Sequence, residues 1–288
     1  MLAAGCMSVL HVASKSVRRA IAREVVAIFN DVERGEKPVA RRSDGLFGPD
    51  SVAWRVHGDV TTMMIGGVAG LLLQMLHPAV LAGVWDHSNF RGDMQGRLRR
   101  TARFIALTTY GGRDEAEAAV GRVKAIHAKI GGQLPDGSSY RADDPALLAW
   151  VHVTEVISFL SAWIRYADPL MPRARQDRYF AEVAGIAQSL GADPVPRDRN
   201  AAERLIWEMR HELRADARTR EVAGLLLTQH ADRLVAEPLL AIALRAGADL
   251  LPPWAQRMHG FQSSFVTRHA VRTGALGLAR TLRWAFGR

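Results

Sequence analysis

Residues 143–165 read DDPALLAWVHVTEVISFLSAWIR and predict the central helix of the fold. Asp144 suits the N-cap, and Pro145 suits the first helical position, where a missing N–H leaves no hydrogen bond unmade. Apolar side chains recur at the helical spacing of 3.6 residues, at Leu148, Val156, Phe159 and Trp163. The other face carries the more polar Thr154, Ser158, Ser161 and Arg165.

His152 lies within the apolar stripe, one turn after Leu148 and one turn before Val156. A neutral imidazole in apolar surroundings is a strong ligand for a metal ion or a haem iron. The alternative is a core histidine whose ring is hydrogen-bonded to a nearby carbonyl. The stretch by itself leaves both interpretations open.

Composition narrows the class of protein. The 288 residues are 48% hydrophobic, which is enough for a sizeable core and excludes wholesale disorder. Lys and Arg number 38 against 29 Asp and Glu, a net charge of +9 that suits phosphate or propionate groups or an anionic membrane. Aromatic residues make up only 7%, and no basic run is interleaved with them, so we expect no nucleic-acid partner.

Cys6 is the single cysteine. It excludes an internal disulfide, a cysteine-rich zinc site and covalent c-type haem attachment, and it fits a reducing compartment. We therefore expect a cytoplasmic protein. The stretch 2–6 is similar to a lipoprotein cleavage box, but no basic and apolar leader precedes it. We interpret it as a chance match, or as an upstream start with Met7 the natural one.

The organisation of the chain predicts a single all-α domain, because no alternating strand run and no internal repeat is present. We expect residues 1–43 to form a basic amphipathic helix and a linker, 44–235 the main body of the domain, and 236–288 basic helices packed on that body. The first helix has apolar residues at helical spacing, namely Val17, Ile21, Val25, Ile28 and Phe29.

Residues 60–85 carry no fixed charge and are long enough to span a bilayer. Several residues in this stretch argue against a membrane span, namely Gln74, His77-Pro78 and the glycines at positions 66, 67, 70 and 83. Glycines permit close backbone approach to another helix or to a flat cofactor. We favour a buried central helix kinked near His77.

Two clusters of basic residues could meet anionic groups. A helix expected from Arg97 to Tyr110 begins with Arg97, Arg99, Arg100 and Arg103, whose charges oppose the helix dipole. Ligand carboxylates could hold them, or they could form a solvated face. The basic tail from Trp254 could lie on an anionic membrane or pack as a surface helix with snorkelling side chains, and we favour packing. The basic residues of this tail are Arg257, Arg268, Arg272, Arg280, Arg283 and Arg288.

Other chemical motifs are few. The chain lacks a glycine-rich phosphate loop, a Gly-x-Ser-x-Gly elbow and a His-Glu-x-x-His helix. Glu208 and His211 have the Glu-x-x-His spacing of a di-iron carboxylate site, but no second copy is present.

An ordered set of short motifs resembles the rubber oxygenase (latex-clearing protein) catalytic-domain family, which also includes the fungal oxygenase MpaB. The likeness covers roughly residues 44–235. The motifs are GLFGPDS at 45–51, LHP at 76–78, DHSNF at 86–90, TTYG at 108–111, the segment 122–127, Asp144-Pro145, and WVH at 150–152. The resemblance implies an all-α protein with a globin-like core and a non-covalent haem b, acting with O2 on alkenes.

The resemblance also implies roles for individual residues. His152 matches the axial haem histidine, and 122–127 matches the helix on the distal side. Arg122 and Lys124 would stabilise bound oxygen or occupy the sixth position, although Val123 stands where the family has threonine. The family's catalytic glutamate has no counterpart within 97–103.

We therefore predict a haem b-dependent oxygenase that acts with O2 on a small apolar substrate, alkene- or terpenoid-like. His127 would supply a polar group beside the cofactor, and Arg99 and Arg103 would meet its propionates. For His77 and His87 we expect structural hydrogen bonds. The alternatives are a non-catalytic haem sensor or carrier and a helical di-iron protein. The sequence makes no prediction of the oligomeric state.

Overall fold

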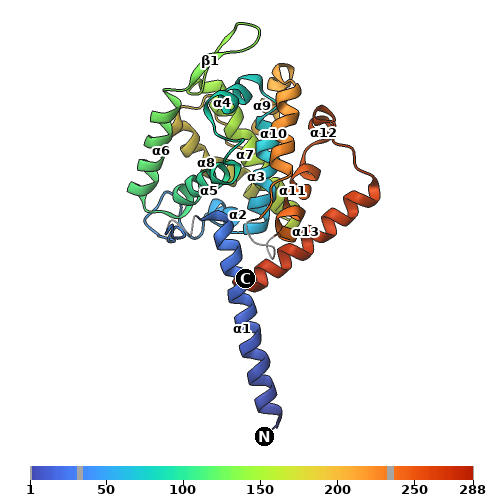
Figure 1. Ribbon diagram of the computed structural model, residues 1–288. Helices are drawn as coiled ribbons and strands as arrows, with labels where there is room; N and C mark the ends of the chain where they lie inside the picture. Colours follow the sequence, from blue (N-terminus) through green and yellow to red (C-terminus); the bar gives the residue numbers. More distant parts are fainter. Residues whose placement is uncertain (1, 31–34, 232–236, 288) are drawn as a thin grey trace.

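The computed structural model describes residues 2–30, 35–231 and 237–287, with side chains from residue 15 onward except residue 29. The side chains of Cys6 and Phe29, and Arg288, lie outside the described residues. The described chain is helical apart from one hairpin (Figure 1), which confirms the all-α prediction. Its elements are α1 (Leu2–Phe29), α2 (Val52–His57), α3 (Val60–Gln74), α4 (Pro78–His87), α5 (Met94–Tyr110), α6 (Arg113–His127), β1 (Gly131–Gln133), β2 (Ser139–Arg141), α7 (Pro145–Tyr166), α8 (Arg173–Leu190), α9 (Arg199–Met209), a 3-10 turn (Arg210–Glu212), α10 (Ala217–Leu227), α11 (Glu237–Leu250), α12 (Pro253–His259) and α13 (Phe265–Phe286).

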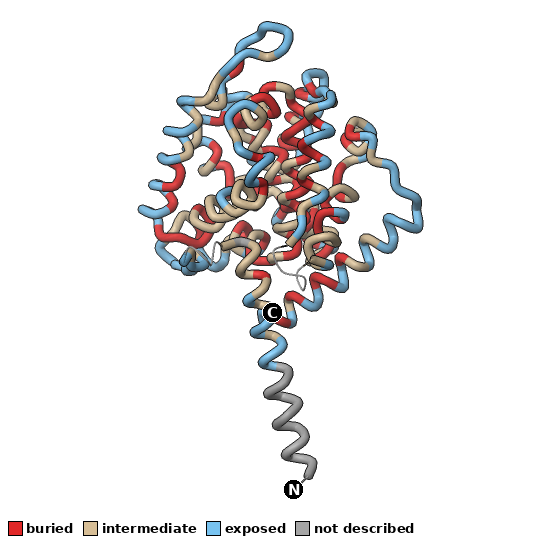
Figure 2. The backbone as a smooth tube through the Cα atoms, in the orientation of Figure 1, coloured by how far each residue is buried: buried red, intermediate tan, exposed pale blue. Residues whose placement is uncertain are grey.

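Helix α7 forms the centre of the domain, as its sequence predicts. The Asp144 carboxylate accepts hydrogen bonds from the backbone N–H groups of Ala146 and Leu147, and Pro145 follows it. Figure 2 shows the buried residues concentrated in the helices at the middle of the body. Because neighbours surround α7, its polar face is buried too: Thr154 is 0% and Ser158 3% exposed. The more polar face of the helix is therefore packed against neighbouring elements at these two residues.

The glycines of α3 explain how α7 is enclosed. A Cβ atom at Gly66 would lie 2.8 Å from the Cα atom of Phe159, and one at Gly70 would lie 3.3 Å from the Cα atom of Glu155. Only glycine permits this approach without displacing backbone. Of the two expected partners for the glycines, another helix or a flat cofactor, the structure shows the helix.

The apolar run 60–85 is bent, as expected from His77-Pro78. Helices α3 and α4 meet at an angle of 104°. His77 is the N-cap of α4, where its Nδ1 accepts a hydrogen bond from the N–H of Ala79. This corner turns the chain inside the body.

Sequence periodicity misses the hairpin of β1 and β2. Its strands are three residues long, too short to show alternation, and Gly132 pairs with Tyr140. A turn at 135–137 joins them, with Gly137 at φ 86° and Asp136 accepting a hydrogen bond from the N–H of Ser138.

The C-terminal helices pack on the domain. Leu278 and Leu282 of α13 form a small apolar cluster with Val25 of α1. Two arginines of α13 pair with buried carboxylates: Arg272 with Asp249 at 2.8 Å, and Arg283 with Asp59 at 2.7 Å. These arginines anchor the helix. Contact of the remaining basic residues with a membrane stays a prediction.

Among the described residues, α7 by itself is long and apolar enough to cross a membrane, and the bent pair α3 and α4 passes the same test jointly. In the most apolar window of α7, 56% of the residues are buried inside the protein. This burial is typical of a core helix.

Candidate functional site

A cavity of about 90 Å³ lies between α5, α6, α7 and α8. The apolar stripe expected on α7 forms one wall, through Leu148, Val156 and Phe159 together with His152. Most of the other lining side chains are apolar as well, namely Phe104, Ile105, Val151, Val183, Ile186, Ala187, Leu190 and Ala192. A concave, apolar site with a few polar groups is the usual form of a small-molecule or cofactor site.

His152 is the first polar group of this cavity. Its Nε2 atom is buried and has no hydrogen-bond partner among the described residues. Burial lowers the pKa of His152 to about 4, so the imidazole is neutral near pH 7. The alternative was a core histidine whose ring is hydrogen-bonded to a carbonyl, and no such bond is present at Nε2. Burying a polar atom without a hydrogen bond lowers the stability of the fold. The fit to an iron ligand is chemically sound, because a neutral imidazole nitrogen in an apolar wall is what haem iron requires.

Glu155 is the second polar group; the sequence shows it three residues after His152, the reverse of the Glu-x-x-His spacing, but gave no reason to place it in a site. It lies one helical turn after His152 and lines the same cavity. Among the described residues, none forms a hydrogen bond or an ion pair with its carboxylate. Burial raises the pKa of Glu155 to about 7.

His57 closes one end of the cavity and belongs to a hydrogen-bonded chain. Its Nε2 lies 2.7 Å from the hydroxyl oxygen of Tyr179, and its Nδ1 lies 2.8 Å from Oγ1 of Thr109. Burial lowers the pKa of His57 to about 3 and raises that of Tyr179. The chain is therefore a neutral network joining α2, α5 and α8. Its residues lie in separate helices without a shared motif, so periodicity gave no sign of it.

Helix α6 presents different residues to the cavity than the resemblance implies. His127 lines the cavity, and burial lowers its pKa. Arg122 and Lys124 are exposed and are not among the lining residues, whereas Val123 between them is half-buried. The cause is the helical period, which directs the positions on either side of Val123 away from the body.

The two arginines expected near the propionates contact the N-terminal segment. Nε of Arg99 donates to the carbonyl oxygen of Ile28 at 3.2 Å, and Nη1 of Arg103 donates to that of Lys37 at 3.2 Å. Neither lines the cavity. Nearby, Arg100 pairs with Asp93 at 3.1 Å, so the protein supplies acidic partners of its own.

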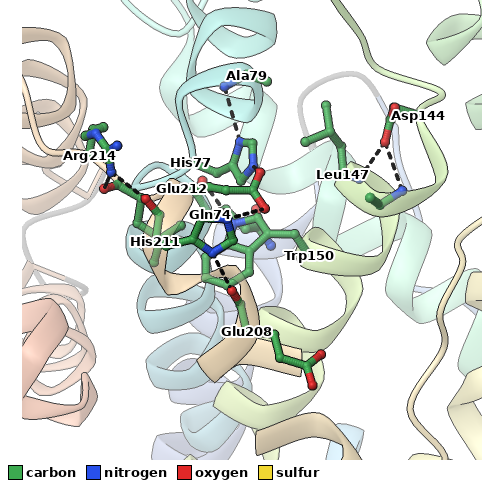
Figure 3. Close-up of polar contacts among 12 residues, drawn as sticks. Gln74, His77, Ala79, Asp144, Leu147, Trp150, Glu208, His211, Glu212 and Arg214 are labelled. Carbon is green, nitrogen blue, oxygen red and sulfur yellow. Dashed lines mark hydrogen bonds and ion pairs between the residues drawn. The ribbon is translucent and has the colours of Figure 1, made fainter. Parts of the chain in front are cut away.

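His77 and His87 have the structural roles expected of them. Nε2 of His77 lies 3.3 Å from the Glu212 carboxylate at the α3–α4 corner (Figure 3), and Nε2 of His87 lies 3.1 Å from the carbonyl oxygen of Gly131. Since a carbonyl oxygen accepts, the Nε2 of His87 is the donor. Both rings join segments distant in sequence.

The structure does not assemble a di-iron site at Glu208 and His211. Both are exposed, and the His211 ring contacts the backbone oxygen of Glu208 at 2.7 Å while the Glu208 carboxylate points away (Figure 3). No group of three or more His, Cys, Asp or Glu suited to a metal ion occurs in the part of the chain that is described.

A helical domain with an apolar cavity and a histidine nitrogen that lacks a hydrogen-bond partner among the described residues has the form of a small-molecule site. The chain belongs to the family described as ER-bound oxygenase mpaB/B′/rubber oxygenase, catalytic domain, whose model matches residues 54–284. This confirms the suspected family and the oxygenase class, and the match continues through α13, beyond the 44–235 of the motifs. No curated protein and no solved structure matches the chain.

Proposed function

We propose that this domain is a haem b-dependent oxygenase acting with O2 on an apolar, alkene- or terpenoid-like substrate, with His152 as the axial ligand. The observation that carries the proposal is the buried Nε2 atom of His152, which has no partner among the described residues and lies in an apolar cavity. When bound, haem b supplies the iron that activates O2.

The chain would hold His152 in place through α7. The Asp144 cap fixes the start of this helix, and the close contact of Gly66 with Phe159 fixes its distance from α3. Desolvation keeps the imidazole neutral, so its nitrogen lone pair is free for a ligand. The apolar wall excludes water and favours a hydrocarbon over a polar substrate.

His127 would be the polar group of the cavity on the α6 side. It lines the cavity, whereas Arg122 and Lys124 are exposed. We therefore propose His127 ahead of those two residues as the hydrogen-bonding group near the reacting oxygen. Arg99 and Arg103 hold the N-terminal segment, and we propose no cofactor role for them.

A haem-binding sensor or carrier is the second candidate. The observation that favours it is the cavity lining itself, which contains no Lys or Arg among the described residues and so lacks the basic distal groups that the family resemblance implies. Such a protein would bind haem through the same His152 but would not convert a substrate.

The test is turnover by the haem-loaded full-length chain. We would incubate it with air-saturated buffer, a reductant and either squalene or limonene, and measure O2 consumption and carbonyl products by mass spectrometry. The proposal expects substrate-dependent O2 uptake that His152→Ala abolishes and that His269→Ala, a change at an exposed site, preserves. Haem binding without O2 uptake on any alkene would instead support the sensor or carrier.

A further inference from the structure

Helices α1 and α13 carry basic side chains that the protein does not pair with carboxylates. α13 contains no acidic residue, and the described side chains of α1, from residue 15 onward, include one, Glu24. Arg272 and Arg283 of α13 pair with Asp249 and Asp59. The other basic residues form no ion pair within the described part of the chain, namely Lys15, Arg18, Arg19, Arg23, Arg268 and Arg280. Two helices that pack together thus present a positively charged surface.

Apolar side chains are exposed on the same surface. Leu276, Arg280 and Trp284 follow one another at intervals of four residues, so they lie along one face of α13. Leu276 is 37% and Trp284 44% exposed. The guanidinium of Arg18 lies over the ring of Trp284, 5.6 Å from its centroid, which brings the basic residues of α1 to this face. The residues of α13 that pack on the protein are different ones, namely Ala275, Leu278, Ala279, Leu282 and Ala285.

The first turns of α13 stand clear of the body. Every residue from 262 to 270 is exposed, and Phe265 and Val266 are 81% and 74% exposed. This part of α13 forms an arm along the outside of the molecule that leads down to α1 (Figures 1 and 2). Apolar side chains left in water forgo the free energy that burial provides. The arm therefore has apolar groups to bury as well as charges to neutralise.

We propose that α1 and α13 together form a docking surface for an anionic phospholipid membrane, on which the protein lies peripherally. Lys and Arg are attracted to phosphatidylserine headgroups, and Trp and Phe favour the boundary between headgroups and acyl chains. Helices that combine basic and apolar residues lie in this interface. A nucleic acid would satisfy the arginines, but its phosphate backbone offers no apolar region for Phe265, Val266 and Leu276.

This surface is separate from the cavity and from the family match. α1 precedes residues 54–284, which the family model matches, so membership of the family does not account for its basic residues. The inference goes beyond the proposed function and does not depend on it.

The experiment is sedimentation of the full-length chain with phosphatidylcholine vesicles that contain or lack phosphatidylserine. The first variant combines Arg18→Ser, Arg19→Ser and Arg23→Ser on α1. Each arginine contributes about 1 kcal/mol at an anionic surface, so we expect this variant to bind phosphatidylserine vesicles roughly 100-fold more weakly than the wild type. The matched control loses the same charge from exposed positions on α6, α8 and α9, and it should bind nearly as the wild type does. Its substitutions are Arg122→Ser, Arg175→Ser and Arg204→Ser.

A further variant tests the apolar part of the surface. Phe265→Ser with Val266→Ser leaves the charge unchanged at two exposed positions, and it should also weaken binding. Circular dichroism would establish that each variant is folded, and the assay needs neither cofactor nor substrate.

Three results would overturn the inference. One is an equal loss of binding in the α1 variant and its control, which would make net charge responsible rather than this surface. The second is equal sedimentation of the wild type with both kinds of vesicle, or with neither. The third is wild-type binding by the variant at Phe265 and Val266 together with binding of duplex DNA, which would favour a nucleic acid.

Discussion

His152 and Glu155 lie one turn apart on α7 and line the same cavity, and the buried Nε2 of His152 has no hydrogen-bond partner among the described residues. Both are held by packing. The α3 glycines bring the two helices into backbone contact, with Gly70 against Glu155 and Gly66 against Phe159. These two polar groups of the cavity are thus positioned by a close contact between α3 and α7.

That contact makes Gly66 sensitive to substitution. In Gly66→Ala the new Cβ atom would lie 2.8 Å from the Cα atom of Phe159, which is backbone and cannot rotate away. We expect a loss of about 1–3 kcal/mol in the free energy of unfolding, measured by urea denaturation. Gly121→Ala is the control, since its Cβ would meet nothing within 4 Å; it should gain about 0.5–1 kcal/mol. Equal midpoints for Gly66→Ala and wild type would contradict the packing account.

Glu155 predicts a pH dependence of stability in the haem-free protein. Its pKa rises from 4.5 in the unfolded chain to about 7 in the fold, so the folded state binds the proton more tightly. This contribution is fully present below pH 4.5 and is lost as the pH rises to 7, a change of about 3 kcal/mol. Relative to wild type, Glu155→Gln should therefore be more stable at pH 8 than at pH 4.5. Urea unfolding of both proteins across this pH range checks the prediction. If the difference in the free energy of unfolding between Glu155→Gln and wild type did not change with pH, the raised pKa of Glu155 would be contradicted.

Asp249 ties α11 to α7 and α13. Its carboxylate is 6% exposed and pairs with Arg165 at 3.2 Å and Arg272 at 2.8 Å. We expect Asp249→Asn to destabilise the protein by about 2–4 kcal/mol, because it leaves two cations without their counter-charge. Glu203→Gln, which breaks the more exposed pair with Arg199, should cost no more than about 0.5 kcal/mol. Thermal unfolding of both variants makes the comparison. If Asp249→Asn and Glu203→Gln had similar melting temperatures, Asp249 would not anchor α13 to the domain.

The basic tail predicts weak binding to anionic membranes. Arg272 and Arg283 are engaged in ion pairs, whereas Arg268 and Arg280 are exposed on the same helix, which begins with Phe265, itself 81% exposed. Each free arginine contributes about 1 kcal/mol near a phosphatidylserine surface, so Arg268→Ser with Arg280→Ser should weaken binding by roughly 30-fold. Sedimentation with vesicles, with and without phosphatidylserine, measures this. Equal binding to uncharged phosphatidylcholine vesicles would show that charge is not responsible.

Sequence reasoning predicted the helices well where the signals are local. The Asp144-Pro145 start of α7, its apolar stripe and the bend at His77 follow from capping chemistry and periodicity. The burial of Thr154 and Ser158 was not predictable, because a helical wheel shows polarity but not which neighbours surround the helix.

The candidate site was predictable only in part. His152 stands in an apolar stripe and could be found, whereas His57 and Tyr179 come together from helices distant in sequence and carry no motif. Arg122 and Lys124 were chosen from the family resemblance, and it was the rotation of α6 about its axis that the sequence left undetermined.

The measurement that tests the central claim most directly is haem content after expression with haem precursor, by pyridine haemochrome assay. The account predicts about one haem b per chain with a Soret band, lost in His152→Ala and retained in His269→Ala. A colourless wild-type protein despite haem supply, or a His152→Ala variant with unchanged haem content and spectrum, would contradict it.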